Sequence, residues 1–320
     1  FQHKHRAALL HWPFPNDPKF DELVNQIYDH CQVIVITITE LHNKSVDFIR
    51  RFDRAKIIYY IAGFLQEQPK LAKVETYMDW FHTSRHFYKN HLPEILQRIK
   101  PGIKENYFDI LLGRKKPHRD YINTYVTKRL RVEQYFMTYF NEHEIDFAEN
   151  KLLQYWEQPG LRFIDNPKWT VDMVEYFGLK MSISQVIPID IYNRTAYSVI
   201  AETCYFNEFS FFTEKTAKPI IAKRLFVMFA GQGYLERLRQ MGFQTFDGII
   251  DESYDKEYDP VIRWRMACQQ LESLTQQPQD QVLEQIQPIV DHNFRVIMNR
   301  EWYKEFSESL SNQFLQLLQT

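Results

Sequence analysis

The sequence predicts an α/β protein with two Rossmann-like domains and a C-terminal helical extension. Length is the first observation, because 320 residues exceed what a single hydrophobic core usually organises. The second is the β-branched run QVIVITIT at 32–39, which is typical of a parallel strand covered on both faces. The third is an alternation of strand-like and helix-like segments that restarts after the turn signal KPG at 100–102. The predicted domains are 1–102 and 103–275, followed by the extension 276–320.

Each expected strand of the first domain is an apolar or β-branched run that ends at a turn signal. Residues 6–12 (RAALLHW) are closed by a proline-rich turn, and 55–62 (AKIIYYIA) end at Gly63. Helical spacing of apolar residues fills the intervals between the strands. The expected order is strand 6–12, helix 20–30, strand 32–39, helix 46–52, strand 55–62 and a helical region 74–99 that breaks near Pro93.

The second predicted domain repeats this pattern. A basic loop at 113–119 separates the strand 107–112 from the helix 120–131. Residues 141–166 carry mixed signals, which suit an insertion or an active-site flap. The other expected strands are 135–140, 182–188, 196–202 and 225–230, the other helices are 234–240, 260–274 and 279–318, and 245–250 is expected to be extended or irregular.

Composition excludes several classes of protein. Hydrophobic residues make up 44% of the chain and aromatic residues 16%, which excludes a disordered protein. A net charge of −2 argues against a protein devoted to coating nucleic acid. No apolar run approaches the ~18–20 residues that span a bilayer and no signal peptide is visible, so we expect no membrane span. Widely spaced cysteines, odd in number, suggest a reducing compartment, and we expect a cytoplasmic protein.

The most informative segment of the chain is 202–242. It reads as strand, loop, helix, strand, glycine turn and helix, the unit of an open α/β sheet whose ligands bind beyond the carboxyl ends of the strands. The first strand ends in Glu202, and a polar loop leads from it to Thr213-Glu214-Lys215. Without a metal, a departing diphosphate needs lysine or arginine charges and unpaired N–H groups at a helix N-terminus. This combination of residues therefore suits a sugar diphosphate.

Two starts are open for the helix that follows. Thr213 can cap a helix that kinks at Pro219, or the helix proper begins near Lys218, where proline is tolerated in the first turn. Both leave Lys215 and Lys218 close to a helix N-terminus, where an anionic ligand would bind. The alternative interpretation is an ordinary capped surface helix with solvated lysines.

The same segment resembles the signature of the α1,3-fucosyltransferase family. In that signature a strand ending in Glu leads to a Tyr- or Phe-rich loop, then Thr-Glu-Lys, a helix, and a Val-Pro-Val strand ending in Gly. Here Glu202, 211–215 (FFTEK) and 225–227 (LFV) with Gly231 stand at these places, while Thr203 replaces the family's Asn and the proline is missing. The chain is also similar to uncharacterised glycosyltransferase-like proteins of bacteria and their viruses, in the runs IYNRT at 191–195, GFQTF at 242–246 and DESYD at 251–255.

The resemblance implies a GT-B fold, an inverting mechanism and a nucleotide-sugar donor bound in the C-terminal domain. It implies that Lys215 holds the diphosphate and that Glu214 contacts the donor sugar or the ribose. A GDP-sugar such as GDP-fucose is the donor that the family suggests. The nucleotide-sugar is a co-substrate, and we expect no separate cofactor and no metal.

Two arginines extend the expected donor site. Arg119 ends the basic loop 113–119, and the family has an arginine in this strand–loop position. Arginine suits forked recognition of phosphate. Arg194 stands just ahead of the strand that ends at Glu202. A solvated loop or a contact to nucleic acid is the alternative for the basic run. The full set of expected donor-binding residues is Arg119, Arg194, Glu202, Thr213, Glu214, Lys215 and Lys218.

The catalytic base of an inverting transfer must take the proton of the acceptor hydroxyl. Glu40 and His42 follow the strand 32–39 of the first domain, at its carboxyl end, and are the expected catalytic residues. A capping role for Glu40 is the alternative, and Asp79 and His82 are rival bases. His82 has a histidine four residues on, but no Glu as in a zinc protease helix, so a metal site is not expected there.

These observations together predict an inverting, metal-independent glycosyltransferase. It would move a sugar from a nucleotide-diphosphate donor to a hydroxyl, with a glycan or modified DNA as the acceptor. One alternative is a glycosyltransferase that acts on a modified base in DNA, as the basic loop and the viral relatives suggest. Another is a non-catalytic binding or scaffold protein, whose helical region 279–318 would be its partner surface.

Overall fold

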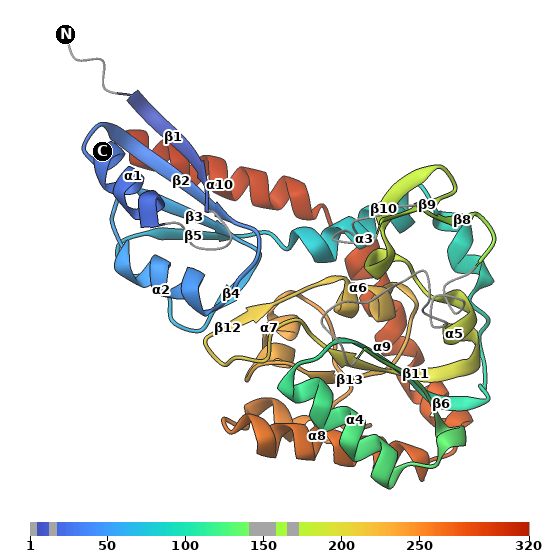
Figure 1. Cartoon of the computed structure of the whole chain (residues 1–320). Coiled ribbons are helices and arrows are strands. Elements are labelled where there is room, and N and C mark those ends of the chain that lie inside the picture. Colours follow the sequence, from blue (N-terminus) through green and yellow to red (C-terminus); the bar gives the residue numbers. More distant parts are fainter. Residues whose placement is uncertain (1–4, 13–17, 141–157, 165–172, 320) are drawn as a thin grey trace. The chain divides into compact units, whose positions relative to one another are not determined.

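The computed structural model describes residues 5–12, 18–140, 158–164 and 173–319, and it contains two compact α/β units (Figure 1). Unit 1 consists of Phe1–Asp79, Phe206–Phe212 and Arg300–Thr320, and unit 2 of Trp80–Tyr205 and Thr213–Asn299. The predicted α/β class with parallel sheets is confirmed. Most of the expected insertion or flap at 141–166 lies outside the described residues.

The division of the chain differs from the predicted domains, because both units use distant segments. The helical region after Asp79 belongs to unit 2, where the Arg85 guanidinium donates to the Ile297 carbonyl and the Tyr88 hydroxyl accepts from the Ile187 amide. The last helix returns to unit 1, so 276–320 is not one extension. These contacts join residues about 100 or more positions apart, and such distant contacts leave no mark on local sequence patterns.

Unit 1 is built on a parallel sheet with the strand order β1-β2-β3-β5. A second, two-stranded antiparallel sheet pairs β4 with β12, which arrives from the middle of the chain. The approach is so close at Gly63 that a Cβ there would lie 2.1 Å from the Ser210 carbonyl oxygen. The elements of unit 1 are β1 (His5–His11), α1 (Pro18–Tyr28), β2 (Cys31–Ile38), α2 (Asn43–Arg51), β3 (Ile57–Ile61), β4 (Gly63–Leu65), β5 (Lys73–Thr76), β12 (Phe209–Phe211) and α10 (Trp302–Gln319).

Helices cover both faces of the unit 1 sheet, as the β-branched run of β2 predicts. Successive side chains of a strand point to opposite faces. Val33 and Val35 pack against Phe314 and its neighbours on α10. On β3, Tyr59 contacts Phe48 of α2, with ring centroids 6.2 Å apart. The prediction that 74–76 is helical is wrong, because these residues belong to the short edge strand β5.

Unit 2 is built on a parallel sheet with the strand order β13-β11-β6-β7. From β6 the chain moves outward to β7, and from β11 it moves outward in the other direction to β13. The elements are α3 (Asp79–Asn90), η1 (Pro93–Arg98), β6 (Asn106–Arg114), α4 (Pro117–Arg129), η2 (Val132–Gln134), β7 (Tyr135–Phe140), β8 (Leu161–Phe163), β9 (Met173–Tyr176), β10 (Leu179–Ser182), η4 (Ile183–Gln185), α5 (Ile189–Arg194), β11 (Thr195–Ala201), α6 (Glu214–Ile221), β13 (Phe226–Phe229), α7 (Tyr234–Gln240), η5 (Glu252–Lys256), α8 (Pro260–Thr275) and α9 (Gln279–Asn299).

The reversal of direction between β6 and β11 is a topological switch point, where open α/β sheets bind their ligands. It also places the crossover helices on opposite faces, since each crossover is right-handed. Helix α4 packs with α8 on one face, and α6 packs with α9 on the other (Figure 1).

A small antiparallel meander, β8-β9-β10, precedes β11 and was not predicted as strands. The predicted strand 182–188 is wrong: η4 occupies 183–185, and Val186 and Ile187 are buried in an irregular connection. Apolar residues can thus be buried without joining a sheet. None of the helices in the described parts of the chain combines the length and apolar character that a bilayer crossing requires.

Candidate functional site

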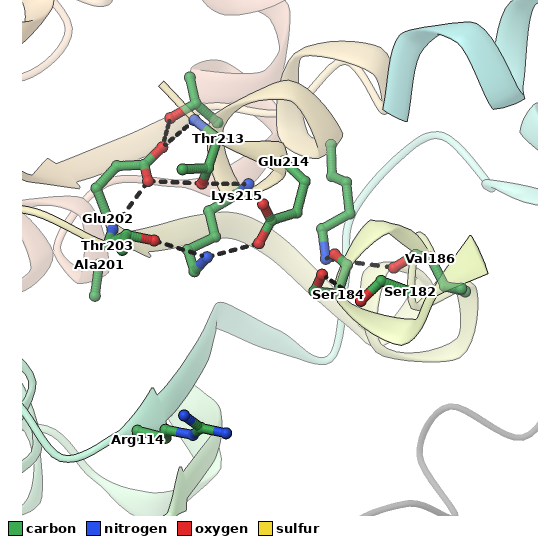
Figure 2. A network of polar contacts seen from close by, with 12 residues as sticks. Arg114, Ser182, Ser184, Val186, Ala201, Glu202, Thr203, Thr213, Glu214 and Lys215 are labelled. Carbon is green, nitrogen blue, oxygen red and sulfur yellow. Dashed lines mark hydrogen bonds and ion pairs between the residues drawn. The ribbon is translucent and has the colours of Figure 1, made fainter. Parts of the chain in front are cut away.

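The candidate site lies at the switch point of unit 2, beyond the carboxyl ends of β6 and β11. Arg114 ends β6, Glu202 and Thr203 follow β11, and Thr213 caps α6, whose first turn carries Lys215. Figure 2 shows Glu202, Thr203, Thr213, Glu214 and Lys215 in one polar network. The structure therefore brings together the core of the predicted donor-binding set.

Glu202 is the centre of this network and is fully buried. Its Oε1 accepts from the Thr213 amide at 3.2 Å, the Thr216 hydroxyl at 2.7 Å and the Tyr234 hydroxyl at 3.0 Å. Its Oε2 accepts from the Thr203 amide at 3.0 Å and the Thr213 hydroxyl at 2.7 Å. Buried carboxylates need such partners. In this structure Glu202 fixes the start of α6 to the end of β11.

The start of α6 settles the two alternatives left by the sequence. Thr213 is the N-cap, its hydroxyl accepts from the Lys215 amide at 3.3 Å, and Pro219 lies inside the helix. The helix begins at Glu214 and not near Lys218. A capped first turn gives this point a partial positive charge, which favours anions.

Lys215 is the basic residue of this turn that reaches solvent. Its Nζ lies 2.6 Å from Glu214 Oε1 and 3.3 Å from Thr203 Oγ1, and its side chain keeps 29% of its surface exposed. Glu214 itself is only 5% exposed. Burial acts to raise the pKa of Glu214, but the charges of Lys215 and Lys218 outweigh it and leave that pKa below its ordinary value. Glu214 is therefore ionised at neutral pH.

Lys218 is buried, and its ammonium group is bonded to backbone carbonyls. Its Nζ donates to the Ser184 carbonyl at 2.5 Å and to the Val186 carbonyl at 3.3 Å. Burial lowers the pKa of Lys218 to about 8, although Glu214 opposes the shift. In this structure Lys218 anchors the η4 turn, and its predicted contact with a donor would require these bonds to break.

Arg119 is held inside the switch point. The predicted loop 113–119 is shorter than expected, because β6 continues to Arg114 and α4 begins at Pro117. Arg119 is 5% exposed, and its guanidinium donates to the Arg114 carbonyl at 2.8 Å and to the Ala201 carbonyl at 3.4 Å. It thus joins the ends of β6 and β11 and supplies positive charge from beneath the edge.

Neighbours of Arg119 that are not in the predicted donor-binding set lie closer to the surface. Lys116 donates to the Thr203 carbonyl at 2.5 Å, while Arg114 and Lys115 are exposed. Lys115 forms a long ion pair with Asp120 at 3.9 Å. Figure 2 shows the Arg114 side chain with no hydrogen bond to the other residues drawn. Their position directly after a strand is the signal that could have identified them.

Arg194 is not part of this group. It ends α5 and precedes β11, so it lies at the amino end of the strand whose carboxyl end carries Glu202. Its Nε forms an ion pair with Glu105 at 3.7 Å, and its guanidinium lies 5.9 Å from the Phe136 ring centroid. A strand of this length separates its two ends by roughly 20 Å. The structure therefore does not bring Arg194 to the predicted donor site.

The glycine turn after β13 is closed by the protein itself. Gly233 adopts a φ of 73° and precedes α7. The buried Asp255 carboxylate accepts from the Leu235 amide at 2.9 Å and from the Glu236 amide at 3.0 Å. This helix N-terminus already holds an anion, so the cations beyond β6 and β11 are the ones open to a ligand.

The predicted catalytic residues lie after β2 of unit 1. Glu40 is exposed. His42 caps α2, its ring centroid lies 5.0 Å from that of Trp12, and burial together with Lys44 lowers its pKa. Among the rivals, Asp79 accepts from the Tyr60 hydroxyl at 2.7 Å, and His82 is buried in unit 2.

Within the described residues, no group of three or more His, Cys, Asp or Glu side chains could hold a metal ion. Comparison with family models, curated proteins and solved structures found no match to this chain.

Proposed function

We propose that the chain is an inverting, metal-independent glycosyltransferase that moves a sugar from a nucleotide-diphosphate donor to a hydroxyl. The observation that carries this proposal is the position of Lys215 at the switch point of unit 2. It stands on the first turn of α6, partly exposed, beside a strand end that carries further cations. A diphosphate leaving group needs this kind of preorganised positive charge.

The balance of charge at this edge supports an anionic ligand. The acids there are satisfied internally, Glu202 by neutral donors and Glu214 by Lys215. Arg114 and Lys115 remain exposed at the end of β6. The helix dipole of α6 adds to their attraction for phosphate. A GDP-sugar remains the donor that the resemblance suggests.

The reaction assigns the remaining roles. The acceptor oxygen attacks the anomeric carbon, the bond from that carbon to the diphosphate breaks, and the nucleoside diphosphate leaves with its charge stabilised by Lys215 and its neighbours. The acceptor proton passes to a base, for which Glu40 is our first candidate and His42 the second. Asp79 is the rival base.

Donor binding tests the proposal directly. Thermal unfolding is measured with UDP-, GDP-, CMP- and dTDP-sugars, and one nucleotide should stabilise the protein by about 2.7 kcal/mol at a hundredfold excess over its Kd. Lys215→Met should remove this stabilisation, and Arg194→Gln is the matched control because it removes a positive charge at the opposite end of β11. A donor site at Lys215 would be refuted if no nucleotide-sugar raised the unfolding temperature, or if both variants lost the stabilisation equally.

Turnover separates an enzyme from a binding protein. Once the stabilising nucleotide-sugar is known, its transfer to an acceptor can be followed by mass spectrometry of the product. Glu40→Gln should keep donor binding and lose this transfer. Full transfer by this variant eliminates Glu40 as the base. Donor binding without transfer by the wild type, to glycan or DNA acceptors, would favour the non-catalytic alternative.

A further inference from the structure

Unit 1 carries a cluster of partly exposed aromatic rings at the carboxyl edge of its sheet. We call Tyr60, Tyr77, Tyr303 and Phe306 the unit 1 aromatic cluster. Tyr60 is near the end of β3, Tyr77 directly follows β5, and the other two lie in the first turns of α10. This edge is where open parallel sheets present their ligand sites.

The rings contact one another without forming a closed stack. The Phe306 centroid lies 4.9 Å from that of Tyr60 and 5.0 Å from that of Tyr77. The Tyr77 and Tyr303 centroids are 5.9 Å apart with an interplanar angle of 83°. Tyr303 is 66% exposed, although a tyrosine ring has much apolar surface to bury.

Asp79 places a carboxylate at this cluster. Both of its oxygens lie 2.7 Å from the Tyr60 hydroxyl. Burial raises the pKa of Asp79, and the hydrogen bond from Tyr60 opposes that shift. A carboxylate has about four acceptor positions, so one carboxylate can serve several hydroxyl donors at once.

Helix α10, which carries two of the four rings, is joined to the sheet by contacts deeper in the unit. The buried Glu75 of β5 accepts from the Ser309 hydroxyl at 2.6 Å and also from the Gln313 side chain, both on α10. Farther along, α10 packs against Val33 and Val35. These contacts place Tyr303 and Phe306 beside Tyr60 and Tyr77 before any ligand arrives, and such preorganisation lowers the entropy cost of binding.

We propose that the unit 1 aromatic cluster and Asp79 bind a sugar ring of a saccharide acceptor. The inference rests on the proposed function and names its acceptor class. The C–H face of a pyranose is apolar and packs on aromatic rings, while its hydroxyls donate to a carboxylate. A ring face beside a carboxylate matches both sides of such a ligand.

Charge favours a neutral saccharide over a nucleic acid. Lys304 on the first turn of α10 and Arg300, which precedes the helix, are each paired with a carboxylate, at 3.9 Å to Glu308 and 2.6 Å to Glu305. Asp79 adds a further negative charge. A phosphate backbone is bound through Lys and Arg charges that carry no competing carboxylate. Both cations described here already have a carboxylate partner.

Saturation-transfer NMR tests the inference without any nucleotide. The probes are the methyl glycosides of glucose, galactose, mannose, N-acetylglucosamine and fucose, each offered to the full chain. At least one should receive saturation from the protein, and Tyr303→Ala should weaken its binding by about threefold to tenfold. Tyr258→Ala is the matched control, because Tyr258 is a 73% exposed tyrosine of unit 2.

Asp79→Asn supplies a second variant that keeps the shape of the side chain. It should also weaken glycoside binding, while circular dichroism reports an unchanged fold. Absence of saturation with every glycoside overturns the inference, as does unchanged binding in both Tyr303→Ala and Asp79→Asn. Binding of a duplex oligonucleotide that Tyr303→Ala abolishes overturns it in favour of a nucleic acid. Donor binding at Lys215 is measured separately, so either proposal can fail alone.

Discussion

Glu202 gives the sharpest test of how the candidate site is built. Replacement by alanine removes the common acceptor of the Thr203 and Thr213 amides and of three hydroxyl groups. The Thr216 and Tyr234 hydroxyls, 2.8 Å apart, can still bond to each other, but the two amides are stranded. Stranding buried donors costs about 1–3 kcal/mol each, so Glu202→Ala should lower the free energy of unfolding by about 3–5 kcal/mol.

Glu202→Gln is the matched variant. It should lower the free energy of unfolding less than alanine does, because three donors bond to one carboxylate oxygen and two to the other. The amide oxygen should take the Oε1 position, where three donors converge. The NH₂ group then faces the Thr213 hydroxyl, which can rotate to accept, and the Thr203 amide, which cannot. One lost bond should cost about 1–2 kcal/mol.

Urea unfolding followed by circular dichroism measures both variants, with hydrogen exchange of peptide 209–225 to locate the effect in α6. Faster exchange there should accompany Glu202→Ala. A loss below about 1 kcal/mol for alanine, or equal losses for alanine and glutamine, would refute a network centred on this carboxylate.

Further predictions concern the charges around this network. Glu214→Gln removes the partner of Lys215 and should tighten pyrophosphate binding about threefold to tenfold in calorimetry, whereas unchanged affinity would mean that Lys215 does not meet the anion. His118 is buried, its Nε2 lies 2.9 Å from the Glu202 carbonyl, and burial lowers its pKa to about 3. Neutral His118 contributes its full stabilisation above the pKa of the unfolded state, and this contribution is lost as the pH falls below that value. Between pH 7 and 4, the free energy of unfolding of the wild type should therefore fall by about 3 kcal/mol more than that of His118→Gln. A parallel pH profile of the two proteins would contradict this. Lys218, with its pKa lowered to about 8, binds fewer protons folded than unfolded between pH 8 and 10, so the wild type should gain about 2 kcal/mol relative to Lys218→Met over that range in urea titrations. No relative gain would show that Lys218 stays charged when buried.

The central strands could be predicted from the sequence because they are buried on both faces. The runs that form β2, β11 and β13 are mostly apolar or β-branched, with a single polar residue in β2 (Gln32) and in β11 (Ser198), a pattern that is typical of buried parallel strands. Strands β4 and β5 are short and lie at sheet edges, and β4 pairs with β12, far along the chain. Their existence depends on partners that no local window contains.

The candidate site could be predicted where its residues are contiguous. Thr213, Glu214 and Lys215 form one capped turn, so their proximity follows from the chain itself. Lys218 stands three residues on but turns to the carbonyl of Ser184, a contact that spacing cannot reveal. The prediction that Arg194 belongs to the donor site depends on its nearness to a strand. A residue that precedes a parallel strand, however, lies at the edge opposite the ligand site. The direction of the strand was readable from the sequence and should have excluded it.

The proposed function requires this edge to attract a diphosphate while it already holds two acids. Glu202 accepts hydrogen bonds from hydroxyls and amides and not from a lysine or arginine, although its negative charge still acts on the nearby Arg119. Arg119 is tied to backbone carbonyls and keeps its full charge at the switch point. Glu214 is paired with Lys215, so in the proposed function an arriving phosphate would compete with it for that lysine. In the proposed function, the buried Arg119 therefore adds positive field from beneath the edge, while the cations that reach solvent, Lys215, Arg114 and Lys115, would meet the anion.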